Sequence, residues 1–257
     1  NGVAAAMYAA CKATVKVGDG NEISLHEQTN YPFEETIRFT VNTPKAVSFP
    51  FYLRIPSWTE GATIFVNGKK VAANPEAGQY ACINREWKDN DQVEIQLPMQ
   101  LSMRTWQVNK NSVSVDYGPL TMSLKIDEDY VKKDSRATAI GDSKWQEGAD
   151  ASQWPTYEIY AKTPWNYALV LGKNEPLKDF KVVHKEWPAD NFPFTVASTP
   201  IEVKAIGRKV PSWVIDQYDL CSELPEMDAP KGEKEEITLI PMGAARLRVS
   251  AFPNTRE

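Results

Sequence analysis

The sequence has 257 residues, of which 42% are hydrophobic and 25% are charged, and its formal net charge is −5. This length suits one large domain or two ordinary ones, and the composition is typical of a globular protein. The negative charge disfavours a nucleic-acid partner, because binding a phosphate backbone requires clustered Lys and Arg. No stretch contains the roughly 20 consecutive apolar residues that a transmembrane helix requires, so we expect no membrane span.

The first hundred residues are dominated by side chains that alternate between apolar and polar. Residues 36–41 and 48–55 follow this pattern, which is typical of half-buried β-strands. Asn67-Gly68 separates two further short strands and strongly favours a hairpin, because both residues tolerate positive φ. The 18 prolines disfavour long helices. Short strands at this spacing predict a first β-sandwich over residues 1–105.

Residues 106–257 predict a second sandwich of the same kind. Its expected strands lie at residues 112–116, 120–126, 157–160, 167–171, 180–184, 201–205, 236–241 and 246–252. Residues 127–152 are charged and poor in large aliphatic side chains, which predicts a long surface insertion. The expected fold is therefore all-β, with two consecutive antiparallel β-sandwich domains of the jelly-roll type.

The sequence offers few residues for a metal site or a catalytic centre. Cys11, Cys82 and Cys221 are far apart, and His26 and His184 are the only histidines, whereas zinc requires three or four close ligands. We expect free thiols that are buried or half-buried, no metal and no cofactor. No G-x-S-x-G motif accompanies either histidine, and no glycine-rich phosphate-binding motif occurs.

Several acidic clusters invite comparison with the carboxylate pair of a glycosidase. They are Glu34-Glu35, Glu86 with Asp89 and Asp91, and Asp127-Glu128-Asp129. Neighbouring residues on a strand point to opposite faces, and Asp favours turns for local backbone reasons. We therefore expect structural or solvated roles for these carboxylates and predict no catalytic residue in this chain.

Four aromatic residues lie close together in the second half of the sequence: Trp154, Tyr157, Trp165 and Tyr167. Rings that carry a polar group can stack on the apolar face of a sugar, so these residues are candidates for a carbohydrate-binding platform. The alternative is that the same rings pack in the core or between domains. The sequence leaves both interpretations open.

A series of short motifs resembles the region that follows the catalytic barrel in glycoside hydrolase family 127, whose members are β-L-arabinofuranosidase-like bacterial proteins. The motifs are Leu53-Arg54-Ile55-Pro56-Ser57-Trp58, Val66-Asn67-Gly68, Arg85-x-Trp87, Leu97-Pro98-Met99, Tyr117-Gly118-Pro119-Leu120, Thr163-Pro164-Trp165-Asn166-Tyr167 and Leu239-Ile240-Pro241-Met242-Gly243. Each motif is weak alone, but their order and spacing extend the resemblance over almost the whole chain.

The resemblance implies that catalysis belongs to another part of a larger protein. In that family an N-terminal (α/α)6 barrel carries a cysteine nucleophile, a glutamate acid/base and a cysteine-rich zinc site, and two β-sandwiches follow. None of the three cysteines here has that context, so none of those roles is carried over. Because the chain begins at Asn1, we expect that something precedes it and that residues 2–8 form the first strand after the barrel.

The resulting hypothesis is a non-catalytic accessory region that supports the N-terminal catalytic barrel of the same protein. The parent would be a glycoside hydrolase, while this chain alone would be inactive. The alternative is a carbohydrate-binding module for arabinose-containing plant glycans, and a third interpretation is a small self-contained β-enzyme. Contacts within a homo-oligomer stay open. If the parent degrades plant glycans, a periplasmic or secreted location fits better than a cytoplasmic one.

Overall fold

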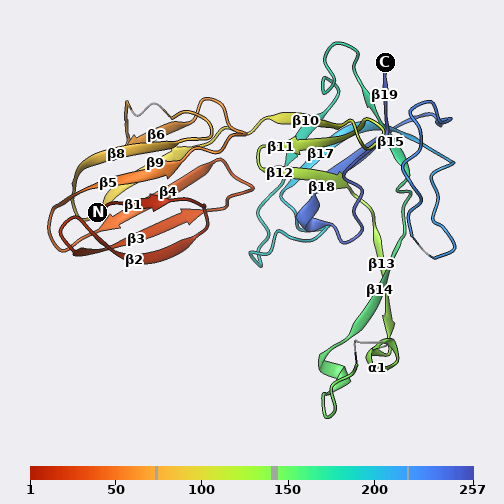
Figure 1. The fold of residues 1–257 in the computed structure, drawn as a ribbon, viewed down its shortest axis with the longest axis horizontal. Helices are drawn as coiled ribbons and strands as arrows, with labels where there is room; N and C mark the ends of the chain where they lie inside the picture. The colour runs from red at the N-terminus through yellow and green to blue at the C-terminus, as the bar shows by residue number, and fades with distance from the viewer. Residues whose placement is uncertain (73–74, 140–143, 219) are drawn as a thin grey trace. The chain divides into compact units, whose positions relative to one another are not determined.

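The chain, in a computed structural model that describes residues 1–72, 75–139, 144–218 and 220–257, forms two compact units. The first unit is Asn1–Ser102 with Asp116–Leu120, and the second is Met103–Val115 with Thr121–Glu257. Strands make up nearly all of the regular structure (Figure 1), which confirms the all-β class. The described helices are short: α1 (Ser135–Thr138), η1 (Ala151–Gln153) and η2 (Met242–Ala244). Within the described ranges, no helix combines the length and the hydrophobicity needed to cross a membrane.

Two sheets enclose the core of the first unit. The larger sheet has the order β2-β3-β4-β9-β6-β7, with bounds in that order of Cys11–Val17, Asn21–Thr29, Thr36–Asn42, Asp91–Gln96, Thr63–Val66 and Lys69–Lys70. The smaller sheet has the order β1-β5-β8, with bounds of Val3–Ala5, Val47–Arg54 and Tyr80–Trp87. The β1–β5 pair is parallel, whereas the other pairs of this unit are antiparallel.

The predicted alternation accounts for this core. Along β5 the side chains of Val47, Phe49, Phe51 and Leu53 are buried, and those between them are exposed or half-buried. Successive strand residues point to opposite faces, so one face of each sheet packs against the other sheet while the outer face meets water. Buried side chains of both sheets accordingly form one continuous hydrophobic cluster. This arrangement is the predicted sandwich.

The Asn67-Gly68 hairpin is also confirmed. Both residues have positive φ, 51° and 75°, and they join β6 to β7. Asn67 is further held by its side chain, whose Oδ1 accepts a hydrogen bond of 2.8 Å from the backbone N–H of Gln92.

The second unit contains an eight-stranded sheet. Its main path is β10-β11-β12-β18-β17-β15-β19, with bounds in that order of Leu101–Trp106, Ser112–Tyr117, Leu120–Leu124, Lys234–Pro241, Ile201–Lys209, Tyr167–Leu171 and Asn254–Arg256. The eighth strand, β16 (Lys181–His184), pairs with the first half of β17, and β15 pairs with its last residues. Every residue of β11 and β15 is buried, so neither strand has an exposed face.

The strand expected at residues 246–252 is not formed, and that prediction was wrong. The backbone N–H groups of Arg246 and Leu247 bond to Glu128 Oε1, at 2.8 and 3.2 Å, and therefore do not enter a ladder. Phe252 pairs with Val113 of β11 as an isolated bridge. The next residue, Pro253, accepts a hydrogen bond from Leu169 of β15. This segment thus bonds to β11 and β12 at isolated points instead of adding a strand.

Residues 127–152, expected to form a long surface insertion, are partly regular. Strand β13 (Glu128–Lys133) pairs in antiparallel fashion with β14 (Thr156–Ala161) over six residue pairs. The two strands form an arm of the second unit that extends away from its sheet (Figure 1). Residues 140–143 of the predicted insertion lie outside the described residues.

Candidate functional site

The four aromatic residues that were candidates for a sugar-binding platform lie in different environments. Trp154 and Tyr157 lie on the arm and are 67% and 46% exposed. Trp165 is half-buried and packs against Trp213. Tyr167 lies in β15 and is only 6% exposed. The four rings therefore do not share one exposed face.

The half-buried Trp165 borders an apolar cleft of about 1070 Å³ in the second unit. Trp165 and Trp213 form its aromatic wall, with ring centroids 5.0 Å apart and ring planes at 71°. The aliphatic lining consists of Ile126, Ile159, Ile215, Leu220, Leu224, Leu247 and Val249. Lys162 and Arg248 add positive charge. The volume and the mixture of aromatic, aliphatic and few polar groups are typical of a small-molecule site.

Hydrogen bonds hold the aromatic wall in place before any ligand arrives. The Trp213 indole N–H donates to the carbonyl oxygen of Ser222 at 3.1 Å. The side-chain amide of Asn166 donates to the carbonyl oxygens of Val210 and Trp213, at 3.0 and 3.1 Å. A wall fixed in this way would lose little side-chain entropy if a ligand bound there.

The described residues that follow Trp213 are held by hydrogen bonds to Asp216. Asp216 donates its backbone N–H to the carbonyl of Leu220, and its side chain accepts from the N–H groups of Tyr218 and Leu220. Ile215, Tyr218 and Leu220 are exposed by 45%, 72% and 62%. The loop therefore presents large apolar side chains next to the cleft.

Sequence reasoning missed Trp213 as a site residue. Tyr167 pairs with Lys209, so Trp165 and Trp213 continue from adjacent ends of β15 and β17. Trp213 lies well beyond the strand predicted at residues 201–205, so the only signal available was a tryptophan outside a predicted strand. It becomes informative only once the pairing of these two strands is known.

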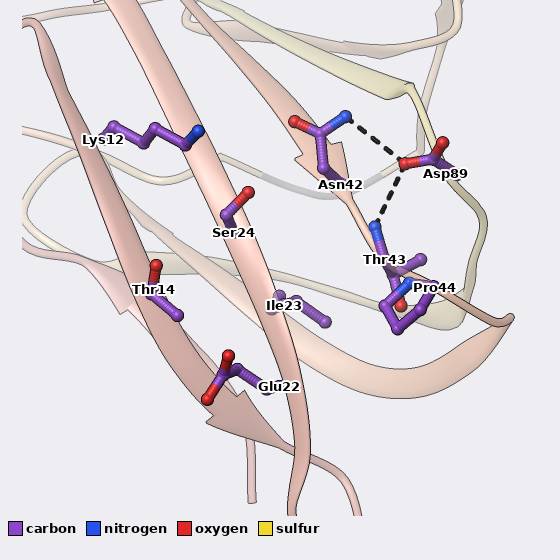
Figure 2. A pocket seen from close by; sticks show the side chains of 9 residues that line it. All are labelled: Lys12, Thr14, Glu22, Ile23, Ser24, Asn42, Thr43, Pro44 and Asp89. Carbon is purple, nitrogen blue, oxygen red and sulfur yellow. Dashed lines mark hydrogen bonds between the residues drawn. The ribbon is translucent and has the colours of Figure 1, made fainter.

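A second hollow, of about 510 Å³, lies on the outer face of the larger sheet of the first unit. Figure 2 shows Asn42 and Thr43 facing Asp89, whose Oδ1 accepts hydrogen bonds of 3.3 Å from Asn42 Nδ2 and 3.1 Å from the Thr43 N–H. Lys12 and Ser24 line the opposite side. The lining residues supply hydroxyl, amide and charged groups but no aromatic ring. This hollow offers hydrogen bonds and no stacking surface.

Several of the candidate carboxylates bind backbone N–H groups. Glu35 Oε1 accepts from the Met99 N–H at 2.7 Å, and Asp91 Oδ2 accepts from the Lys88 N–H at 2.9 Å. Glu128 Oε1 accepts from the N–H groups of Arg246 and Leu247. These contacts hold loops against strands. Over the ranges that the structure covers, no three His, Cys, Asp or Glu side chains lie close enough to hold a metal ion.

The expectation of buried or half-buried thiols was wrong, because Cys11, Cys82 and Cys221 are all exposed. Cys82 lies on β8 between buried residues, so strand alternation places it on the outer face. Cys11 begins β2, an edge strand whose first residues are exposed.

Comparisons with known proteins agree with this architecture. Residues 2–99 match the family model "Beta-L-arabinofuranosidase, GH127 middle domain". Three similar solved structures are a glycoside hydrolase (22% identity, TM-score 0.61), a GH127 β-L-arabinofuranosidase from Geobacillus stearothermophilus T6 (22%, 0.61) and the GH127 β-arabinofuranosidase BT3674 (19%, 0.60). A search of curated proteins found no match.

The similarity covers 98% of this chain but only 36%, 33% and 34% of those three chains, in the same order. The chain thus spans about a third of the length of the structures that it resembles. At these identities the likeness concerns the fold of both units, whereas the family match concerns the first.

Proposed function

The first unit of the chain is a GH127 middle-domain-like sandwich, and from this premise we propose that the chain is a non-catalytic accessory region of a β-L-arabinofuranosidase-like protein. In this role the two units support a catalytic domain of the same polypeptide. The observation that carries the proposal is the match of residues 2–99 to the middle domain of that family. The use of Glu35, Asp91 and Glu128 as backbone acceptors also supports a structural role.

The proposal predicts that the purified chain does not hydrolyse aryl arabinofuranosides. Retaining or inverting hydrolysis requires a pair of positioned catalytic groups across the sugar, and we assign those groups to the catalytic domain. Release of the aryl alcohol is measured by absorbance, with a complete GH127 enzyme as the positive control. Hydrolysis by the chain that survives repurification would overturn the proposal.

A second candidate function is carbohydrate binding, which two observations favour. Trp154 and Tyr157 are exposed on the arm, and Trp165 forms a fixed aromatic wall with Trp213 in the cleft. Either place offers aromatic surface beside polar groups, which is what stacking on a sugar requires.

Calorimetry with arabinan and arabinogalactan oligosaccharides tests this second candidate. If the cleft binds the sugar, Trp165→Ala is expected to weaken binding about tenfold, while Trp154→Ala leaves it unchanged. If the arm binds the sugar, Trp154→Ala is expected to weaken binding about tenfold, while Trp165→Ala leaves it unchanged. The absence of binding heat at millimolar sugar for the unmodified chain would exclude carbohydrate binding.

A further inference from the structure

Glu27 occupies a core position of the first unit. It lies on β3 between Cys11 of β2 and Phe39 of β4, on the face that also carries the buried Ile23 and Leu25. Only 6% of Glu27 is exposed. Burial removes the water that stabilises a carboxylate, so an ionised glutamate is costly at this position unless protein groups replace that water.

The contacts of Glu27 replace little of that water. Its Oε1 accepts a hydrogen bond of 2.9 Å from the Ala9 N–H, and Cys11 Sγ lies 3.9 Å from its Oε2. Among the described residues, no Lys, Arg or His forms an ion pair with Glu27. The Ala9 contact comes from the residues that precede β2, and the Cys11 contact comes from the first residue of β2.

A second buried glutamate shows what a compensated carboxylate looks like in this protein. Glu202 of the second unit is 7% exposed, and its Oε1 lies 2.9 Å from Lys125 Nζ and 3.2 Å from Lys185 Nζ. Burial alone would raise the pKa of Glu202, but the two lysines hold it below its ordinary value. Among the described residues, Glu27 has no such partner. Burial therefore makes its ionised state less favourable in the folded protein than its protonated state.

Residues 6–10, called here the crossing segment, connect β1 in the smaller sheet to β2 in the larger sheet. The Tyr8 hydroxyl donates to the carbonyl oxygen of Arg54 in β5 at 2.6 Å, which ties the segment to the smaller sheet. Its ring packs edge-on against Tyr31 with centroids 5.8 Å apart. The Ala9–Glu27 hydrogen bond ties the same segment to the larger sheet. Glu27 therefore provides one of the attachments of the crossing segment, through a hydrogen bond to the larger sheet.

The titration of Glu27 falls near neutrality. Burial raises its pKa to about 7, and the hydrogen bonds from Ala9 and Cys11 oppose only part of that rise. Burial also raises the pKa values of Tyr8 and Tyr31, and partial desolvation together with the nearby Glu27 raises that of Cys11, so these neighbours lose their protons at higher pH.

The other charged and ionisable groups around the crossing segment do not pair with Glu27. Arg54 and Tyr80 lie near Tyr8. His26 is adjacent to Glu27 on β3, and strand alternation places it on the opposite, exposed face.

We propose that Glu27 makes the attachment of the crossing segment depend on pH, so that the segment is held when the carboxyl is protonated and loosens when it ionises. The sign follows from the burial of a carboxyl that has one backbone donor and no cation among the described residues, because ionisation there costs more than the stronger Ala9 hydrogen bond returns. The stabilising contribution is fully present below about pH 4.5, the ordinary glutamate value, and is lost as the pH rises through about 7. Loosening is expected because the ionised group recovers hydration when water reaches it.

Hydrogen exchange of the full chain tests the proposal. The opening constant of residues 6–11, corrected for the intrinsic pH dependence of exchange, is expected to rise by up to about tenfold per pH unit between about pH 5 and pH 7. In Glu27→Gln, which keeps the shape and an acceptor, this rise should disappear. Glu22→Gln, on an exposed position of the same strand, should retain it. Retention of the full rise in Glu27→Gln would overturn the proposal.

A second measurement keeps the proposal testable if Glu27→Gln fails to fold. The side-chain carboxyl carbon of Glu27 can be followed by NMR in the unmodified chain as the pH changes. A midpoint near 7 supports the proposal, and a midpoint near the ordinary glutamate value overturns it.

Discussion

Replacing Trp87 with alanine is expected to destabilise the first unit by about 3–5 kcal/mol. Trp87 ends β8, is fully buried, and donates its indole N–H to the carbonyl oxygen of Phe49 at 3.0 Å. Its ring lies 5.6 Å from the ring of Phe49 and 6.0 Å from that of Phe51. Truncation leaves a cavity between the two sheets and removes the donor for a buried carbonyl.

The measurement for Trp87→Ala is the free energy of opening of β5 and β8, obtained from hydrogen exchange. Trp87→Phe keeps most of the ring and loses the hydrogen bond, so its cost should be smaller. Trp154→Ala removes a tryptophan that is 67% exposed and should change stability by less than about 0.5 kcal/mol. A loss below about 1 kcal/mol in Trp87→Ala would show that the ring does not anchor this core.

The second large effect is expected at Asp91, which joins two turns of the first unit. Its Oδ1 accepts from Asn67 Nδ2 at 2.8 Å, its Oδ2 accepts from the Lys88 N–H at 2.9 Å, and Arg85 Nη2 lies 3.4 Å away. Asp91 is 7% exposed. Asp91→Ala removes these acceptors and leaves their donors without partners, which should cost about 3 kcal/mol.

The stabilisation by Asp91 should also depend on pH. Burial raises the pKa of Asp91, but the hydrogen bonds from Asn67 and Lys88 and the charge of Arg85 outweigh burial and hold the pKa below its ordinary value. A lowered pKa means that the stabilisation is present above about pH 4 and is lost as the pH falls through the folded-state pKa. The difference in unfolding free energy between the unmodified chain and Asp91→Asn should therefore shrink in acid.

Glu94→Gln is the matched control for Asp91, because it removes a carboxylate from the same strand. Glu94 pairs with Arg38 at 2.8 Å, but the two side chains are 29% and 62% exposed. An ion pair of this kind contributes at most about 1 kcal/mol. Equal losses at Asp91 and Glu94, measured by urea unfolding, would contradict the role assigned to the Asp91 network.

Local patterns predicted much of the first unit. The alternation along residues 48–55 identified the buried face of β5, and Asn67-Gly68 identified a turn with positive φ at both positions. Both features depend on the geometry of a few neighbouring residues, so they can be recognised without knowledge of the rest of the fold.

The candidate site was predicted only in part. The sequence drew attention to Trp165, but it grouped this residue with Tyr167, which the structure buries in β15. Trp213 completes the aromatic wall from the end of another strand. Strand β15 is apolar and buried on both faces, so its side-chain pattern does not reveal which neighbouring residue points to a cleft.

The sequence by itself determined the all-β class, because alternation and turn residues are properties of short segments. The order of its motifs also indicated the likeness to the GH127 region. Only the tertiary structure decided that residues 246–252 bond to β11 and β12 at isolated points, that Trp165 meets Trp213, and that Glu27 is buried with no cation beside it among the described residues. Each of these depends on which distant segments lie side by side, and that is set by strand pairing and packing over the whole unit and not by any local run of residues.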